Sequence, residues 1–295
     1  MITIDNVTKR YFSLVAVDRV SFTVPRGQVL GILGPNGAGK TTLFNLIAGF
    51  LNPDSGEIRP THGYWPGIGY KPERLLFPNQ MRVAEYLAMI ARLSNLPGNA
   101  IKQTVGEALA QVKLLESSSK RIGQCSKGMR QRLALAQSLI GSPPVLLIDE
   151  PSNGLDPEGQ ADVQHILQRI GAGGQTVIMS SHQLPEVTET CSHLIILKQG
   201  RIHYRGSMVE ALSLRPHVTI QADQDLQPAE AMLTSLHPDI QIEGRQITLS
   251  NEAIRLRRYV LSLLVGMGFD IVAVAQKRTT LEEIYAEAVQ WHNAS

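Results

Sequence analysis

The sequence predicts an α/β fold that is built on a parallel sheet and followed by a small α+β domain. A short apolar run, Val29–Leu33, precedes a glycine-rich loop, which is typical of a buried parallel strand. Further apolar runs at Val145–Ile148, Thr176–Met179 and His193–Leu197 alternate with helical stretches. Such alternation indicates parallel strands that are joined by crossover helices. The composition shifts near Leu214–Pro216, where we expect the second domain to begin.

The first domain, residues 1–214, is expected to contain two further subdomains. Apolar and polar residues alternate between Ile2 and Val24, which predicts antiparallel strands. Residues 74–142 instead place apolar residues at helical spacing, which predicts a helical subdomain. The expected helices of the first domain include Thr41–Phe50, Val83–Leu96, Ile101–Leu115 and Met129–Ile140.

The second domain, residues 215–295, follows the order strand, helix, two strands, helix, strand and helix. This order suggests an α+β domain of ferredoxin-like type. Its expected strands are a run from Val218, Ile240–Ile242, Gln246–Leu249 and Asp270–Ala275, and its expected helices are Pro228–Leu236, Glu252–Val265 and Leu281–Trp291.

Composition and charge narrow the classes of protein. Hydrophobic residues make up 43% of the 295, which is enough for a sizeable core and argues against disorder. The 28 basic and 26 acidic residues give a net charge of +2, and this near balance argues against a nucleic-acid partner. The two cysteines, Cys125 and Cys191, cannot form a disulfide framework, so a reducing compartment is expected.

No apolar run approaches the ~18 residues that a membrane-spanning helix needs. The N-terminus also lacks a basic stretch followed by an apolar one, so the sequence predicts no signal peptide. If the protein serves a membrane, we expect it to do so through another chain.

The glycine-rich loop carries the strongest chemical signal. Gly34-Pro-Asn-Gly-Ala-Gly-Lys40-Thr41 matches the pattern GxxxxGK[ST] between a predicted strand and a predicted helix. Backbone N–H groups of such a loop and the helix N-terminus attract a phosphate. Lys40 can reach the β- and γ-phosphates, and the Thr41 hydroxyl can ligate Mg²⁺. The residues expected to bind the nucleotide here are Gly34, Pro35, Asn36, Gly37, Ala38, Gly39, Lys40, Thr41 and Thr42.

Two acidic residues, Asp149 and Glu150, follow the apolar run Val145–Ile148. Ligands of open α/β sheets gather at the carboxyl ends of the strands, where this pair is expected to lie. Asp149 can hold Mg²⁺, and Glu150 can act as the general base that polarises the attacking water. Together with the phosphate loop, the pair predicts a nucleotide site with Mg²⁺.

The segment Cys125-Ser-Lys-Gly-Met129 resembles the signature LSGGQ of the ABC ATPases. In that family the serine and the glycine backbone contact the γ-phosphate on the opposite subunit, which the resemblance implies for Ser126 and Gly128. Three positions depart from the pattern, because Cys125 replaces Leu, Lys127 replaces the first Gly and Met129 replaces Gln. The Ser-Lys-Gly-Met form is frequent among members that pair with drug-export permeases. The chain thus resembles the ATP-binding subunit of an exporter of the ABC-2 type.

Four further segments match the family in chain order. Ser152–Asp156 resembles the D-loop at the subunit interface, and His182 resembles the switch histidine that contacts the γ-phosphate. Tyr11 resembles the aromatic residue that stacks on adenine, although Phe12 is adjacent. Glu73 stands where the family usually has a glutamine that touches Mg²⁺ and couples to the permease.

The resemblance covers residues 1–214 and implies a P-loop NTPase fold of the ABC cassette type. This fold has a RecA-like parallel core, an antiparallel β subdomain and a helical subdomain. Residues 215–295 resemble the tail extension of many exporter-type ATPase subunits, with Leu281-Glu-Glu-Ile-Tyr285 as its closing helix.

The resemblance also implies an ATPase that powers a separate integral-membrane permease and favours export. Two subunits would meet head to tail, so that Gly34–Thr41 of one and Ser126–Gly128 of the other enclose each Mg-ATP. Lys40, Glu150 and His182 would then be the catalytic residues. A homodimer is expected, although the sequence leaves the identity of the second subunit open. The chain would lie in the cytoplasm, held on the inner face of the membrane by its permease.

Three alternatives belong to other classes. A soluble ABC protein of translation usually carries two cassettes in one chain, whereas this chain has one. A P-loop kinase or GTPase is disfavoured by Ser126 and His182, and the sequence has no guanine-selecting Asn-Lys-x-Asp stretch. A nucleotide sensor with vestigial hydrolysis stays open, because the signature is altered and Glu73 replaces the usual glutamine.

Overall fold

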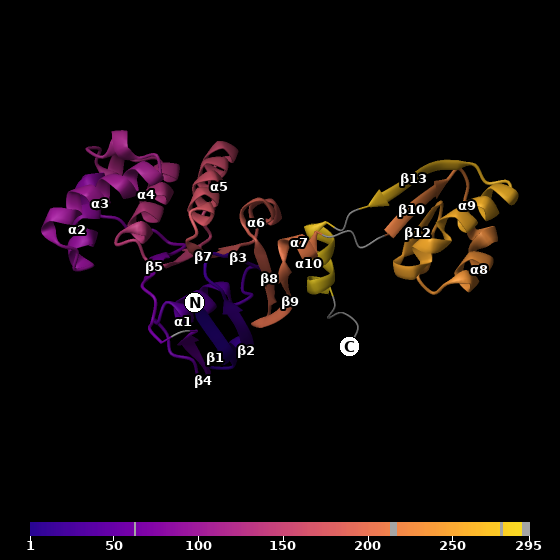
Figure 1. The fold of residues 1–295 in the computed structure, drawn as a ribbon, viewed down its shortest axis with the longest axis horizontal. Helices are drawn as coiled ribbons and strands as arrows, with labels where there is room; N and C mark the ends of the chain where they lie inside the picture. The colour runs from indigo at the N-terminus through magenta and orange to yellow at the C-terminus, as the bar shows by residue number, and fades with distance from the viewer. Residues whose placement is uncertain (62, 213–216, 278–279, 291–295) are drawn as a thin grey trace. The chain divides into compact units, whose positions relative to one another are not determined.

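The computed structural model describes residues 1–61, 63–212, 217–277 and 280–290. These residues form two compact units, one of residues 1–208 with 288–290 and one of residues 209–287 (Figure 1). The expected boundary between residues 214 and 215 lies outside the described residues. The continuous part of the first unit ends at Met208.

A six-stranded sheet of the first unit has the strand order β5-β6-β7-β3-β8-β9. The first five strands of this order are parallel, and β9 pairs antiparallel to β8. Every residue of β3, β6 and β7 is buried, as the apolar runs of the sequence predict. The strands are β3 (Val29–Leu33), β5 (Ile68–Lys71), β6 (Val145–Asp149), β7 (Thr176–Ser181), β8 (His193–Lys198) and β9 (Arg201–Ser207), and helices between them include α1 (Lys40–Ile47), α5 (Pro157–Ala172) and α6 (Leu184–Thr190). The short helix α7 (Met208–Ala211) follows β9.

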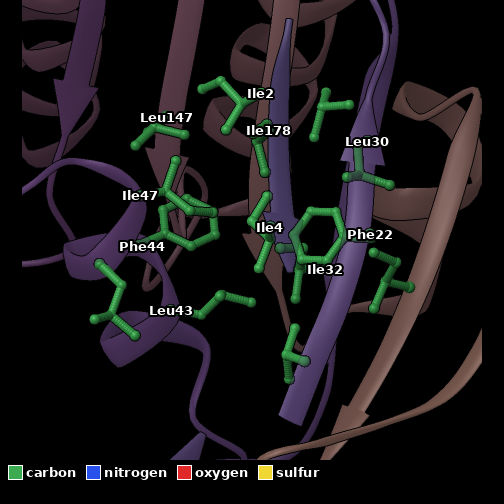
Figure 2. Packing of buried hydrophobic residues seen from close by; sticks show 14 of the residues in the cluster. Ile2, Ile4, Phe22, Leu30, Ile32, Leu43, Phe44, Ile47, Leu147 and Ile178 are labelled. Atoms are coloured by element: carbon green, nitrogen blue, oxygen red, sulfur yellow. The ribbon is translucent and has the colours of Figure 1, made fainter. Parts of the chain in front are cut away.

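A second, antiparallel sheet of this unit has the order β2-β1-β4, formed by Leu14–Val24, Ile2–Tyr11 and Ser55–Pro60. Its apolar residues share one core cluster with α1 and the parallel sheet. Figure 2 shows Phe44 and Ile47 of α1 in this cluster, beside Leu147 of β6. The cluster therefore anchors the helix that directly follows the phosphate loop.

Three helices, α2 (Val83–Leu93), α3 (Gly98–Gln111) and α4 (Lys127–Leu139), pack against one another as the expected helical subdomain (Figure 1). Short 3₁₀ turns at Leu115–Ser117 and Ile122–Gln124 lead into α4. Ser126 caps α4, because its Oγ accepts a hydrogen bond from the Met129 N–H at 3.2 Å. The cap explains why α4 starts two residues before the predicted helix.

The second unit contains an antiparallel sheet with the order β11-β12-β10-β13. Its element order is the expected β-α-β-β-α-β order of a ferredoxin-like domain. The helix expected over Glu252–Val265 is divided into a 3₁₀ segment, Asn251–Leu256, and α9, Arg257–Gly266. The other elements are β10 (His217–Ala222), α8 (Gln227–Leu236), β11 (Ile240–Glu243), β12 (Gln246–Ser250), β13 (Ile271–Lys277) and α10 (Leu281–Gln290).

Apolar residues of α8 and α9, including Leu233 and Leu264, pack with Ile247 of β12 in a core cluster of the second unit. This cluster is separate from the one around α1. None of the helices in the described ranges has the length and apolar character of a membrane crossing.

The core around α1 leads to a stability prediction. Phe44 is fully buried, so Phe44→Ala removes apolar contacts and leaves a cavity, and we expect a loss of about 3–5 kcal/mol of unfolding free energy. Urea denaturation of the full chain would measure this loss. Phe12→Ala is the matched control, because Phe12 is fully exposed. Equal losses in the two variants would contradict the assignment of Phe44 to the core.

Candidate nucleotide-binding site

The phosphate loop connects β3 to α1, which begins at Lys40. Gly39 precedes the helix with a φ of 101°, a left-handed value that glycine adopts without strain. A Cβ atom at this position would lie 2.1 Å from the carbonyl oxygen of Ala16, so only glycine fits. The unpaired N–H groups of the first turn of α1 therefore lie beside the residues of the loop. This is the local arrangement that binds an anion at a helix N-terminus.

Most of the sequence-predicted residues line one cavity of about 510 Å³, a size typical of small-molecule sites, whereas Gly34, Asp149, Ser126 and Gly128 do not line it. The predicted residues that line it are Tyr11, Pro35, Asn36, Gly37, Ala38, Gly39, Lys40, Thr41, Thr42, Glu73, Glu150 and His182. Leu14, Ala16 and Asn153 also line it, although we did not predict them. Of these three, Asn153 falls within the segment that resembles the D-loop, which is the signal that could have identified it.

Gly34 is not among the lining residues, although it is the first residue of the predicted loop. Its carbonyl oxygen instead accepts a hydrogen bond of 2.7 Å from Lys40 Nζ. A Cβ atom at Gly34 would lie 2.2 Å from the carbonyl oxygen of Leu197, so a side chain has no room there. Gly34 thus holds the lysine and permits close packing of the loop on the sheet.

Glu150 lies between two nitrogen-bearing side chains. Its Oε1 is 3.3 Å from Lys40 Nζ, and its Oε2 is 2.7 Å from His182 Nδ1. Lys40 and Glu150 are both buried, so their attraction is little screened by solvent. The three residues predicted to be catalytic therefore form one connected group.

The backbone of Glu150 adopts an unusual conformation. Its φ is 45°, in the left-handed region, which costs a residue with a Cβ atom about 1–2 kcal/mol. The Glu150 N–H donates a hydrogen bond of 3.0 Å to Ser180 Oγ on the neighbouring strand. Surrounding contacts must maintain this conformation, which turns the residue out of β6.

Asp149 is fully buried at the end of β6. Burial raises the pKa of its carboxyl group, while the nearby hydroxyl groups of Ser180 and Thr41 lower it. Ser180 Oγ donates to Asp149 Oδ1, whereas Oδ2 has no partner at hydrogen-bonding geometry within the described residues. A buried carboxylate oxygen of this kind fits a cation that accepts oxygen ligands, such as Mg²⁺.

Glu73 lies on the wall of the cavity, and its Oε1 accepts a hydrogen bond of 3.4 Å from Asn153 Nδ2. This contact joins the segment after β5 to the segment after β6. Glu73 is exposed and borders the same cavity as Thr41, so both can face a nucleotide-bound cation. The carboxylate that replaces the usual glutamine thus remains at the site.

Tyr11 lines the cavity at the end of β1, together with Leu14 and Ala16 of β2. Phe12, the other aromatic residue considered, is fully exposed and does not line it. Tyr11 keeps 40% of its surface exposed, so a ring face is available for a planar base.

Ser126 and Gly128 lie at the start of α4, outside the cavity that the other predicted residues line. Ser126 is exposed, and Lys127 extends over the D-loop, where its Nζ lies 1.9 Å from the position that a Cβ atom of Gly154 would take. The signature residues therefore do not complete the nucleotide site of their own chain.

Lys71 lies two residues before Glu73 and was not among the predicted site residues. It is fully buried at the end of β5, because β5 pairs with β6 inside the sheet. Burial lowers the pKa of Lys71 to about 8, although the carboxylates of Asp149 and Glu186 act in the opposite direction. At neutral pH the ammonium group therefore keeps its charge.

Comparison with known proteins agrees with this geometry. The family model described as ABC transporter matches residues 17–153. The chain is 31% identical to the daunorubicin resistance ATP-binding protein DrrA3 of Streptomyces coeruleorubidus, over 96% of this chain and 94% of that protein. It is 32% identical to the Nod factor export ATP-binding protein I of Ralstonia nicotianae, over 72% of this chain and 69% of that protein.

The fold is also that of solved cassettes. The ATP-binding cassette MJ0796, solved as a dimer in a post-hydrolysis state with ADP and phosphate, superimposes with a TM-score of 0.64 at 23% identity. The match covers 70% of this chain and 99% of that one. Fold, site geometry and relatives over nearly the full length agree, and the chain belongs to the ABC transporter family as an ATP-binding, ATP-hydrolysing subunit.

Proposed function

We propose that two identical copies of this chain close head to tail over two Mg-ATP and thereby drive a separate permease that exports its substrate. The observation that carries this proposal is the separation of the two halves of the site. Lys40, Glu150 and His182 converge on one cavity, whereas Ser126 and Gly128 lie outside it on α4. A triphosphate bound in this cavity would still need hydrogen-bond donors on the side that faces away from Lys40.

A second copy supplies these donors. The N-terminus of α4 offers unpaired N–H groups and an exposed hydroxyl, which suit the γ-phosphate of a nucleotide on the facing subunit. ATP would then act as the link between the subunits, because it binds the closed dimer better than the open one. The relative MJ0796, which has the same fold, was solved as a dimer.

The loop residues Gly34–Thr42 and Lys40 bind the phosphates, and Tyr11 stacks on the adenine. Glu150 orients the attacking water and accepts its proton, while His182 holds the Glu150 carboxylate in place. Thr41, Asp149 and Glu73 would hold Mg²⁺, which shields the charge on the β- and γ-phosphates. Loss of the γ-phosphate then removes the link between subunits and resets the dimer.

The coupling surface is proposed to include Glu73 and the helical region 74–125. Glu73 borders the cavity and contacts Asn153 of the D-loop, so it can report the state of the site to a permease. Export is favoured because one relative is named for Nod factor export. The Ser126-Lys-Gly-Met129 form of the signature agrees with this subfamily.

Glu150→Gln tests the hydrolytic part of the proposal. The amide cannot accept the proton of the attacking water, so we expect turnover to fall by about 100-fold or more while ATP still binds. A steady-state ATPase assay on the full chain gives the rate, and Glu230→Gln, an exposed glutamate on α8, is the matched control. Wild-type turnover in Glu150→Gln would exclude Glu150 as the base.

The same Glu150→Gln variant tests the dimer. Because hydrolysis is blocked, Mg-ATP should hold two copies together, and light scattering after size exclusion should report twice the mass of the chain. Without nucleotide, we expect the mass of a single chain. A single-chain mass in saturating Mg-ATP would overturn the face-to-face arrangement.

Lys40→Ala tests the phosphate loop. Removal of a charge-assisted contact to the phosphates should weaken ATP binding on the order of 10- to 100-fold, measured by titration calorimetry. Lys102→Ala, which changes an exposed lysine of α3, should leave the affinity unchanged. Wild-type affinity in Lys40→Ala would refute the assignment of this loop.

A further inference from the structure

A buried lysine contacts the backbone of the proposed base from outside the nucleotide cavity. Lys71 Nζ donates hydrogen bonds to the carbonyl oxygens of Asp149 at 2.8 Å and of Glu150 at 3.1 Å. Lys71 is fully buried and does not line the cavity. A lysine is rarely buried without a role, because its ammonium group loses its hydration.

The two carbonyl groups lie at the point where the chain leaves β6. Glu150 has a φ of 45°, a conformation that its own side chain disfavours. The Glu150 N–H donates a hydrogen bond to Ser180 Oγ, and the Glu150 carbonyl oxygen accepts one from Lys71 Nζ. Both backbone polar groups of Glu150 are therefore held. The direction of the Glu150 carboxylate follows from this backbone turn, and the carboxylate lies between Lys40 and His182.

We propose that Lys71 is a positioning residue for ATP hydrolysis, which holds two successive carbonyl oxygens and so fixes the turn that directs Glu150 toward the nucleotide. The proposal rests on the role of Glu150 in the proposed function. Lys71 acts only through the backbone of its neighbours, so it should affect the chemical step and leave the binding of ATP unchanged.

Lys71→Met tests this role, because methionine fills a similar volume and removes all three donors. A small displacement of a catalytic group costs on the order of 10- to 100-fold in rate, so we expect kcat to fall by this factor. KM and the ATP dissociation constant should stay within about twofold of the wild type, since the phosphate contacts remain. Unchanged kcat in Lys71→Met would overturn the proposal, and so would a parallel loss of ATP affinity.

The matched control is Tyr70→Phe. Tyr70 precedes Lys71 on β5, but its hydroxyl contacts Asn45 Oδ1 at 3.4 Å and does not contact Glu150. We expect kcat of the wild type in this variant. A tenfold loss in Tyr70→Phe would mean that any disturbance of β5 slows turnover, and the specific role of Lys71 would be refuted.

Lys71→Gln provides a second variant in case Lys71→Met is poorly folded. Glutamine keeps an N–H donor on a shorter side chain, so its kcat should lie between the kcat of Lys71→Met and that of the wild type. Rates are expressed per ATP-bound molecule, at a temperature where each variant is folded, so that partial unfolding does not enter. A Lys71→Gln rate at or below that of Lys71→Met would count against the hydrogen bonds as the cause.

A double-mutant comparison separates this proposal from the proposed function. If Lys71 acts through Glu150, then Lys71→Met should not lower the residual single-turnover rate of Glu150→Gln any further. An equal fold loss in both backgrounds would overturn the Lys71 proposal alone. Fast turnover in Glu150→Gln itself would instead remove the base assignment, whatever Lys71 does.

Discussion

The parallel pairing of three buried strands is the constraint on which the rest of this site depends. In the register of β3 with β7, Leu33 is opposite Ser181, and in the register of β6 with β7, Asp149 is opposite Ser180. The next residues along each chain segment therefore emerge at the same edge of the sheet. These residues are Gly34 of the phosphate loop, Glu150 of the acid pair and His182, so three distant parts of the sequence meet at one edge. A slip of one residue would send their side chains to the opposite faces.

In a single chain, the nitrogen-bearing side chains of the site already have partners. Lys40 is engaged by the Gly34 carbonyl oxygen and by Glu150, and His182 takes up the other carboxylate oxygen. In the proposed function, an incoming triphosphate would compete with Glu150 for Lys40, which would link substrate binding to release of the base. In the proposed dimer, the loop and its donors would cover one side of the nucleotide, and the start of α4 in a second copy would cover the other.

The sequence predicted most of the site because its signals are local. The phosphate loop and the acid pair each follow a recognisable apolar strand, and the strand ends of a parallel sheet share one edge. Tyr11 and Glu73 were assigned to the site because they occupy the same positions in chain order, relative to these motifs, as the matching residues of the family. Lys71 was not identified from the sequence, because its burial depends on the pairing of β5 with β6, and the residues that it contacts lie about 78 positions away.

The capping role of Ser126 has a chemical consequence. Its Oγ uses a lone pair to accept the Met129 N–H, so the hydroxyl hydrogen is left to point elsewhere. An oxygen that already accepts from a helix end becomes a better donor, since the bond polarises its own hydrogen. The Ser126 hydroxyl is therefore expected to prefer hydrogen-bond acceptors, such as anions, over hydrogen-bond donors. Helix initiation and anion preference are in this way encoded by one side chain.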